Sequence, residues 1–80
     1  MKHQLQHYIS HNILKQPDFS FSDDQPLISS GLIDSFRLVE LSVFIETEFN
    51  VKIPDHLITP EHFDTMNLII QTIVRVQGNM

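Results

Sequence analysis

Residues 29–41 read SSGLIDSFRLVEL, and they decide the fold because a serine-rich loop changes here into the pattern of a long helix. We expect this helix to begin at Ser35 and to end near Phe49, since Pro54 soon afterwards cannot continue a helix. Its apolar residues follow the spacing i, i+3, i+7 and i+11, which is typical of a face turned to the core. The residues of this core-facing stripe are Leu38, Leu41, Ile45 and Phe49.

Helical patterns also occur on both sides of this stretch. Residues 2–15 carry aliphatic side chains at helical spacing, and a short helical turn is expected near residues 58–62. The last helix is predicted to run from Asp64, a residue type that favours the N-cap, to about Gln77. Neither strand-like alternation nor an internal repeat appears. The predicted fold class is therefore all-α, a four-helix bundle of three main helices and one short helix.

The connection between the first and second predicted helices is long, running from Pro17 to Asp34. Loops longer than about 12 to 15 residues are uncommon in compact domains and are often functional. Because this loop contains large apolar side chains, we expect several of them to enter the core and to order the loop. These side chains are Phe19, Phe21, Leu27, Ile28, Leu32 and Ile33.

The composition narrows the function. Eighty residues with 41% hydrophobic content predict a single domain over residues 1–80, with little room for a deep enzymatic pocket. The net charge of −5 argues against binding to nucleic acid. No apolar run is long enough for a membrane span and no signal peptide is recognisable, so a soluble, cytoplasmic protein is expected. The absence of cysteine excludes disulfides and thiolate metal sites.

The second predicted helix has a further apolar strip, nearly opposite its core-facing stripe. All of the excess negative charge lies in residues 34–64, so this strip has an acidic rim. An exposed apolar strip of this kind predicts a docking surface for a partner protein, and the alternative is that the preceding loop covers it. The strip consists of Phe36, Val39 and Val43, and its rim includes Glu40 and Glu46.

Ser35 has three possible roles at the start of this helix. A catalytic serine needs a positioned base and an oxyanion hole, and IDSFR lacks the small residues of a G-x-S-x-G elbow. As a cap, Ser35 or Asp34 would accept a hydrogen bond from the first free N–H groups, which leaves the apolar strip unexplained. As an attachment point, Ser35 would place an esterified phosphate favourably at the positive end of the helix.

GLIDSFRLVEL resembles the phosphopantetheine attachment motif of acyl carrier proteins, in which Asp-Ser-Leu precedes a Val-Glu-Leu turn. ETEFNVKIPD resembles the Glu-rich end of this helix in that family, with Phe and then Ile-Pro-Asp, and FDTMNLIIQTI is similar to its last helix. The resemblance covers about residues 5–77. Two positions depart from the pattern, since Phe36 replaces the usual Leu and Arg37 stands where an acidic or neutral residue is frequent.

The resemblance implies a carrier protein with no catalytic residues of its own and no metal site. Its cofactor would be 4′-phosphopantetheine, covalently attached to Ser35, whose terminal thiol carries substrates as thioesters. Asp34 would help to recruit the transferase that attaches the cofactor, together with its metal ion. The residues implied to contact partner enzymes are Phe36, Val39, Glu40, Val43 and Glu46.

The partners implied are a phosphopantetheinyl transferase using coenzyme A and magnesium, an acyl or aminoacyl activating ligase, and a downstream transferase or synthase. The stretches ISSGLIDS and FDTMNLI resemble those of free-standing carriers of aminoacyl or specialised acyl groups, including D-alanyl carriers, more than those of other carriers. Such a carrier would be a monomer in a specialised pathway, such as lipid or nonribosomal peptide biosynthesis. Phe44 stands where fatty-acid carriers often have a small residue, which would reduce room for a long acyl chain.

Three alternatives remain open from the sequence. The chain could be an unmodified helical interaction module, in which Ser35 only caps the helix. It could be a carrier for fatty-acid synthesis, or a fragment of a modular synthetase, although its first Met and its end soon after the last helix favour a free-standing carrier.

The histidines His3, His7 and His11 share one helix face and could bind zinc, but a polar surface explains them more simply.

Overall fold

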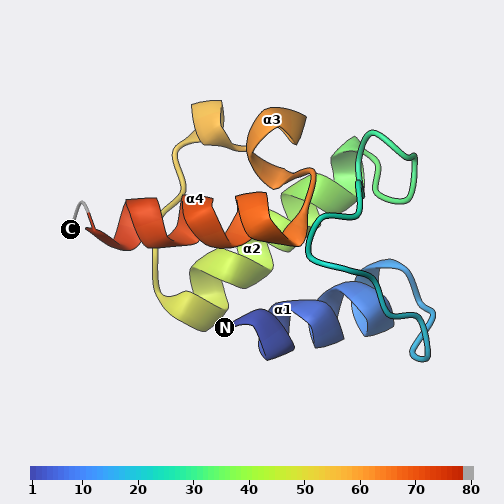
Figure 1. Ribbon diagram of the computed structural model, residues 1–80. Coiled ribbons are helices and arrows are strands. Elements are labelled where there is room, and N and C mark those ends of the chain that lie inside the picture. Colours follow the sequence, from blue (N-terminus) through green and yellow to red (C-terminus); the bar gives the residue numbers. More distant parts are fainter. Residues whose placement is uncertain (79–80) are drawn as a thin grey trace.

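The computed structural model describes residues 1–78 and is all-α, with no strand in that part of the chain. Figure 1 shows α4 crossing α2, with α1 and the short α3 at opposite sides of the molecule. This arrangement confirms the predicted fold class, including the long connection after the first helix. In chain order the elements are α1 (Lys2–Tyr8), the π-helical turn η1 (Ile9–Ile13), α2 (Ser35–Phe49), the 3-10 turn η2 (Asp55–Leu57), α3 (Pro60–Phe63) and α4 (Met66–Gly78).

Helix α2 has the bounds that the sequence predicts. Asp34 is its N-cap, with extended backbone angles and a carboxylate that accepts a hydrogen bond from the Arg37 backbone N–H. At the other end Asn50 adopts the left-handed conformation, with φ 53° and ψ 51°, and its N–H donates to the Glu46 carbonyl. Asn tolerates this conformation better than most residues, so it ends the helix at low cost.

The first helix differs from the prediction of one continuous α-helix over residues 2–15. It changes at Ile9 into a π-helical turn, marked by a Leu14 N–H that donates to the Ile9 carbonyl at 2.8 Å. The wider turn keeps Ile9, Ser10 and Ile13 buried together. The hydroxyl of Ser10 is satisfied inside, because it donates to the Phe19 carbonyl at 2.8 Å.

The last helix begins at Met66, and its cap lies one residue later than predicted. Thr65 caps it, since its hydroxyl accepts a hydrogen bond from the Leu68 N–H at 3.1 Å. The predicted assignment of Asp64 as this N-cap is therefore wrong, because the Asp64 carboxylate has other partners. The short helical turn expected near residues 58–62 corresponds to α3, where Pro60 occupies a first position that suits proline, and the 3-10 turn η2 precedes it.

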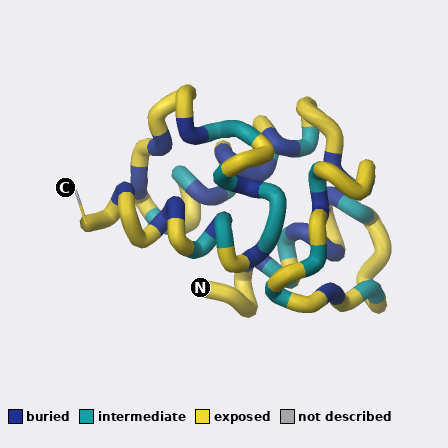
Figure 2. Tube along the Cα trace, turned by 45° about the horizontal axis from the view of Figure 1, so that its top comes forward, coloured by how far each residue is buried: buried dark blue, intermediate teal, exposed yellow. Residues whose placement is uncertain are grey.

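One core joins the helices and the long loop. Within the loop Phe21, Leu27 and Ile33 are buried, which confirms that its apolar residues enter the core. Figure 2 shows buried positions recurring along the whole trace, between exposed ones. Each fully buried Leu, Ile or Phe stabilises the fold by roughly 1.5 to 3 kcal/mol. The fully buried large side chains are Leu5, Ile9, Leu27, Ile33, Leu41, Ile45, Ile53, Phe63, Met66, Ile69 and Ile73.

Phe49, the last residue of the predicted core stripe, is only partly buried, and its ring packs edge-on against Phe44 with centroids 6.4 Å apart. None of the described helices has the length and apolar character that a membrane span requires.

Candidate functional site

Ser35 is the first residue of α2 and is exposed. The cap belongs to Asp34, whose Oδ1 accepts from the Arg37 N–H at 2.9 Å. Because Asp34 fills that role, the Ser35 hydroxyl is not needed as a cap, and it makes no hydrogen bond within residues 1–78. The structure therefore leaves this hydroxyl accessible at the positive end of a 15-residue helix.

The predicted apolar strip on α2 is uncovered. Phe36 is 86% exposed, Val39 is 56% exposed and Val43 is 55% exposed. The long loop packs elsewhere, so the alternative in which it covers the strip does not hold. The strip begins directly beside Ser35 and continues for two helical turns.

Glu40, on the rim of the strip, is engaged by two neighbours. Its Oε1 pairs with Arg37 Nη1 at 3.2 Å, and its Oε2 accepts from the Tyr8 hydroxyl at 3.4 Å. Burial is the main cause that raises the pKa of Tyr8, and the Glu40 charge is the next, so the phenol stays a proton donor. Arg37 thus offsets part of the negative charge that the sequence suggests for this rim.

Glu46, the second predicted rim residue, is also occupied. Its Oε2 accepts from the Ile53 backbone N–H at 2.9 Å, which holds the segment after α2 against the end of that helix. Its role in partner contact stays a prediction. The hydrogen bond to Ile53 shows that this side chain has a structural task as well.

Asp64 lies between α3 and α4 and acts on the loop that leads to Ser35. Its Oδ1 accepts from the N–H groups of Leu27, Ile28 and Ser29, and its Oδ2 accepts from the Ser29 hydroxyl. These hydrogen bonds, that from the Ser29 N–H first, lower the pKa of Asp64 below its ordinary value. Sequence reasoning missed this contact, because the donors lie 35 to 37 residues away.

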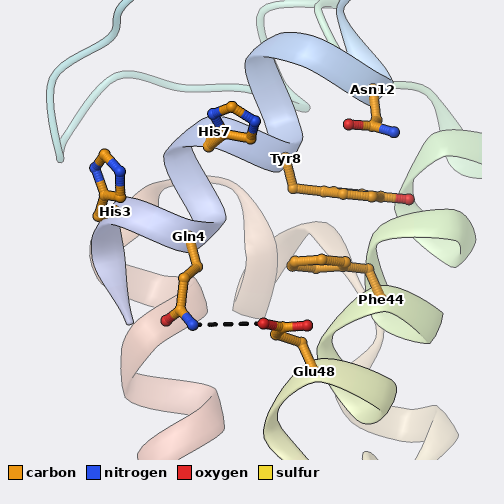
Figure 3. A pocket seen from close by; sticks show the side chains of 7 residues that line it. All are labelled: His3, Gln4, His7, Tyr8, Asn12, Phe44 and Glu48. Carbon is orange, nitrogen blue, oxygen red and sulfur yellow. Dashed lines mark hydrogen bonds between the residues drawn. The ribbon is translucent and has the colours of Figure 1, made fainter.

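A cleft of about 490 Å³ lies between α1 and α2, and Figure 3 shows the side chains that line it. The rings of Tyr8 and Phe44 lie parallel across this seam, with centroids 3.8 Å apart. Gln4 donates to Glu48 at 3.4 Å at the far end. Phe44 therefore forms part of the wall of this cleft. The cleft is lined by His3, Gln4, His7, Tyr8, Asn12, Phe44 and Glu48.

Two of the three N-terminal histidines stack on each other. The rings of His7 and His11 have centroids 3.8 Å apart, and His3 lies along the same helix at the cleft. Within residues 1–78 no three or more histidine or carboxylate side chains are grouped closely enough to hold a metal ion.

Comparison with known proteins indicates the family to which this chain is related. Residues 11–73 match the family described as "Phosphopantetheine attachment site". The D-alanyl carrier protein of Streptococcus equi subsp. zooepidemicus (strain MGCS10565) is 42% identical over 60 residues, covering 75% of this chain and 76% of that protein. The D-alanyl carrier protein of Streptococcus suis (strain 98HAH33) is 36% identical over 59 residues, covering 74% and 75%. The D-alanyl carrier protein of Streptococcus pyogenes serotype M5 (strain Manfredo) is 33% identical over 60 residues, covering 75% and 76%.

Proposed function

Because the chain belongs to the acyl carrier protein family, we propose that Ser35 is the residue that bears its cofactor. The cofactor of this family is covalently attached 4′-phosphopantetheine, and the chain is a carrier rather than an enzyme. The observation that carries the assignment to Ser35 is an exposed hydroxyl, without a hydrogen bond within residues 1–78, at the first position of α2.

The surroundings of Ser35 fit a phosphate ester. The modification would form a bond between Ser35 Oγ and the phosphorus of phosphopantetheine, while the bond from that phosphorus to the nucleotide part of coenzyme A breaks and the Ser35 hydroxyl proton passes to a base. The first N–H groups of α2 favour the negative charge of the resulting diester. When bound, the cofactor supplies the thiol for thioester formation, and the chain has no cysteine to compete with it.

The apolar strip of Phe36, Val39 and Val43 is the surface by which the carrier meets its partner enzymes. Its support is the exposure of three neighbouring apolar side chains next to the attachment point. These partners are a phosphopantetheinyl transferase, an activating ligase and an acceptor enzyme. Residues 1–80 act as one free-standing, monomeric carrier domain in the cytoplasm, where coenzyme A is available.

The proposed cargo is a D-alanyl or related aminoacyl group. The support is the name of the similar proteins, which are D-alanyl carrier proteins. Phe44 agrees with a small cargo, since its ring stacks on Tyr8 in the seam between α1 and α2. Modified protein incubated with a D-alanine ligase and ATP should gain one alanyl group by mass. Exclusive acceptance of long fatty acyl groups in the parallel reaction would contradict this cargo.

The attachment is tested by intact mass before and after incubation with coenzyme A, magnesium and a broad-specificity transferase. The parent should gain one phosphopantetheine, or already carry it, and Ser35→Ala should remain unmodified. Ser20→Ala removes another exposed serine and should behave like the parent. A parent that several transferases leave unchanged would instead favour an unmodified interaction module.

The docking surface is tested with two matched valines. Val43 on α2 is 55% exposed and Val74 on α4 is 54% exposed, so Val43→Asp and Val74→Asp change equally accessible positions. Val43→Asp should raise the KM for the carrier in ligase loading about tenfold, because a charge enters an apolar contact. Val74→Asp should leave KM within about twofold of the parent. Equal effects of the two substitutions would remove the strip from the interface.

A further inference from the structure

We propose that Asp64 is a positioning residue for the modification of Ser35, because its carboxylate holds the turn that leads into α2. This inference rests on the proposed function, in which Ser35 is the attachment point. Asp64 lies outside the attachment motif, in the link between α3 and α4.

The contact is a clamp with five hydrogen bonds at one aspartate. Oδ1 accepts from the N–H groups of Leu27 at 3.2 Å, Ile28 at 2.8 Å and Ser29 at 2.9 Å. Oδ2 accepts from the Ser29 hydroxyl at 2.8 Å, and the Asp64 main-chain carbonyl accepts from the Leu27 N–H at 2.7 Å. Three successive N–H groups that point at one oxygen form an anion-binding concavity, and here the carboxylate of the protein itself fills it.

The clamped segment is continuous with the attachment point. Residues 27–33 form a closed turn, because the Ile33 N–H donates to the Leu27 carbonyl at 2.9 Å. Inside this turn the Gly31 N–H donates to the Ile28 carbonyl at 3.0 Å, with Gly31 at φ 88°. Asp34, the N-cap of α2, follows Ile33 directly. Figure 1 shows the link between α3 and α4 beside this part of the loop. Asp64 is therefore connected to Ser35 through the turn of residues 27–33 and the N-cap residue Asp34.

Removal of the carboxylate should loosen this turn without unfolding the bundle, because the loop has other anchors. The Asn67 N–H donates to the Asp23 carbonyl at 3.1 Å, and Asn67 Nδ2 donates to Asp24 Oδ1 at 2.6 Å. Lys2 pairs with the Asp23 carboxylate at 2.6 Å. The side chains of Leu27 and Ile33 also remain in the core.

A loosened turn has a specific kinetic consequence. If the turn is formed in only a fraction of molecules, the apparent affinity of the transferase for the carrier decreases by that fraction. Once bound, the carrier has the formed turn and reacts at the same rate. A positioning role thus raises KM and preserves kcat, whereas a purely structural role lowers the temperature of unfolding and leaves KM unchanged in the folded protein.

The experiment measures transferase kinetics on the full chain for the parent, Asp64→Ala, Asp64→Asn and Asp18→Ala. Asp18→Ala is the control, since Asp18 is an exposed loop carboxylate and the change of charge is the same. Asp64→Ala should raise KM for the carrier about tenfold, with kcat within about twofold, if the turn is formed in about one molecule in ten. Asp64→Asn should lie close to the parent, because its Oδ1 can accept the same three N–H groups.

Hydrogen exchange gives a second readout that does not depend on the transferase. The amides of Ile28 and Ser29, which lose their acceptor, should exchange faster in Asp64→Ala, while the amides of Leu41 and Ile45 in α2 stay protected. If Asp64→Ala does not fold, Ser29→Ala removes only the Oδ2 contact and should still raise KM about twofold.

The outcomes separate the inference from the proposed function. A parent that is modified at Ser35, with an unchanged KM in Asp64→Ala or in its folded substitute Ser29→Ala, overturns only the role of Asp64. An Asp64→Asn variant as impaired as Asp64→Ala also overturns it, because the acceptor oxygen would not be the cause. A parent that no transferase modifies overturns both.

Discussion

Asp34 and Asp64 each stand just before a helix of the core, yet their carboxylates do different work. Asp34 accepts from the N–H group of Arg37, three residues ahead in its own helix. Asp64 leaves the cap of α4 to Thr65 and accepts from loop amides that lie 35 to 37 residues back in the chain. A carboxylate before a helix can therefore accept hydrogen bonds from its own helix or from donors that the tertiary fold brings near it. Only the first arrangement can be predicted from the local sequence.

Substitution of Asp64 by alanine should have the largest effect on stability. It leaves the amides of Ile28 and Ser29 without their acceptor, while the Leu27 amide keeps its bond to the main-chain carbonyl of residue 64, and partial access of water limits the cost. We expect the free energy of unfolding to fall by about 2 kcal/mol. Urea unfolding followed by circular dichroism measures this as a lower midpoint at unchanged slope. A loss no larger than that of Asp34→Ala would contradict the expectation that Asp64 contributes more to stability than Asp34.

Substitution of Asp34 by alanine should have an intermediate effect. A single N-cap contact is lost, so the free energy of unfolding should fall by about 1 kcal/mol. Thr65→Ala is the matched change at the start of α4 and should cost about the same. The same urea titrations test both variants. A Thr65→Ala variant as stable as the parent would mean that Asp64 substitutes for the missing cap.

The dependence of stability on pH should be the smallest effect and should distinguish Asp64 directly. Hydrogen bonds to its carboxylate, that from the Ser29 N–H first, lower its pKa in the folded state below the ordinary value of 3.8. The unfolded chain then binds the proton more readily, so Asp64 contributes stability above pH 3.8 and loses it as the pH falls through the lower folded pKa.

The stability difference between the parent and Asp64→Asn should therefore be constant from about pH 7 to about pH 5 and shrink below about pH 4. Urea midpoints of both proteins across this range measure it. A difference that does not change in acid would show that the hydrogen bonds do not prefer the charged carboxylate.

The sequence predicts α2 correctly at both ends because its signals are local. An aspartate cap, an apolar stripe and an asparagine followed by a proline lie within a few turns of one another. The exposure of Ser35 and of the apolar strip follows from the same pattern. Helix propensities and caps act over short distances, so a single helix of this kind can be read from its own residues.

The remaining features depend on contacts across the fold. In the π-helical turn the Ser10 hydroxyl donates to Phe19 in the loop, and just before α4 the Asp64 carboxylate accepts from distant loop amides. Glu46 looks like a rim residue in the sequence, but its hydrogen bond to Ile53 appears only once the chain has turned back. No local spacing rule contains these pairings, and this is why the predicted cap at Asp64 is wrong.

The exposed strip on α2 also sets a timescale. Three apolar side chains are a small contact compared with stable protein interfaces, which bury about 1,600 Å². Small contacts of this kind dissociate quickly, because differences in affinity appear mainly in the dissociation rate. A carrier with this surface would leave each enzyme soon after reaction and be free for the next encounter. The throughput of its pathway would then depend on how often it is released as much as on how often it is captured.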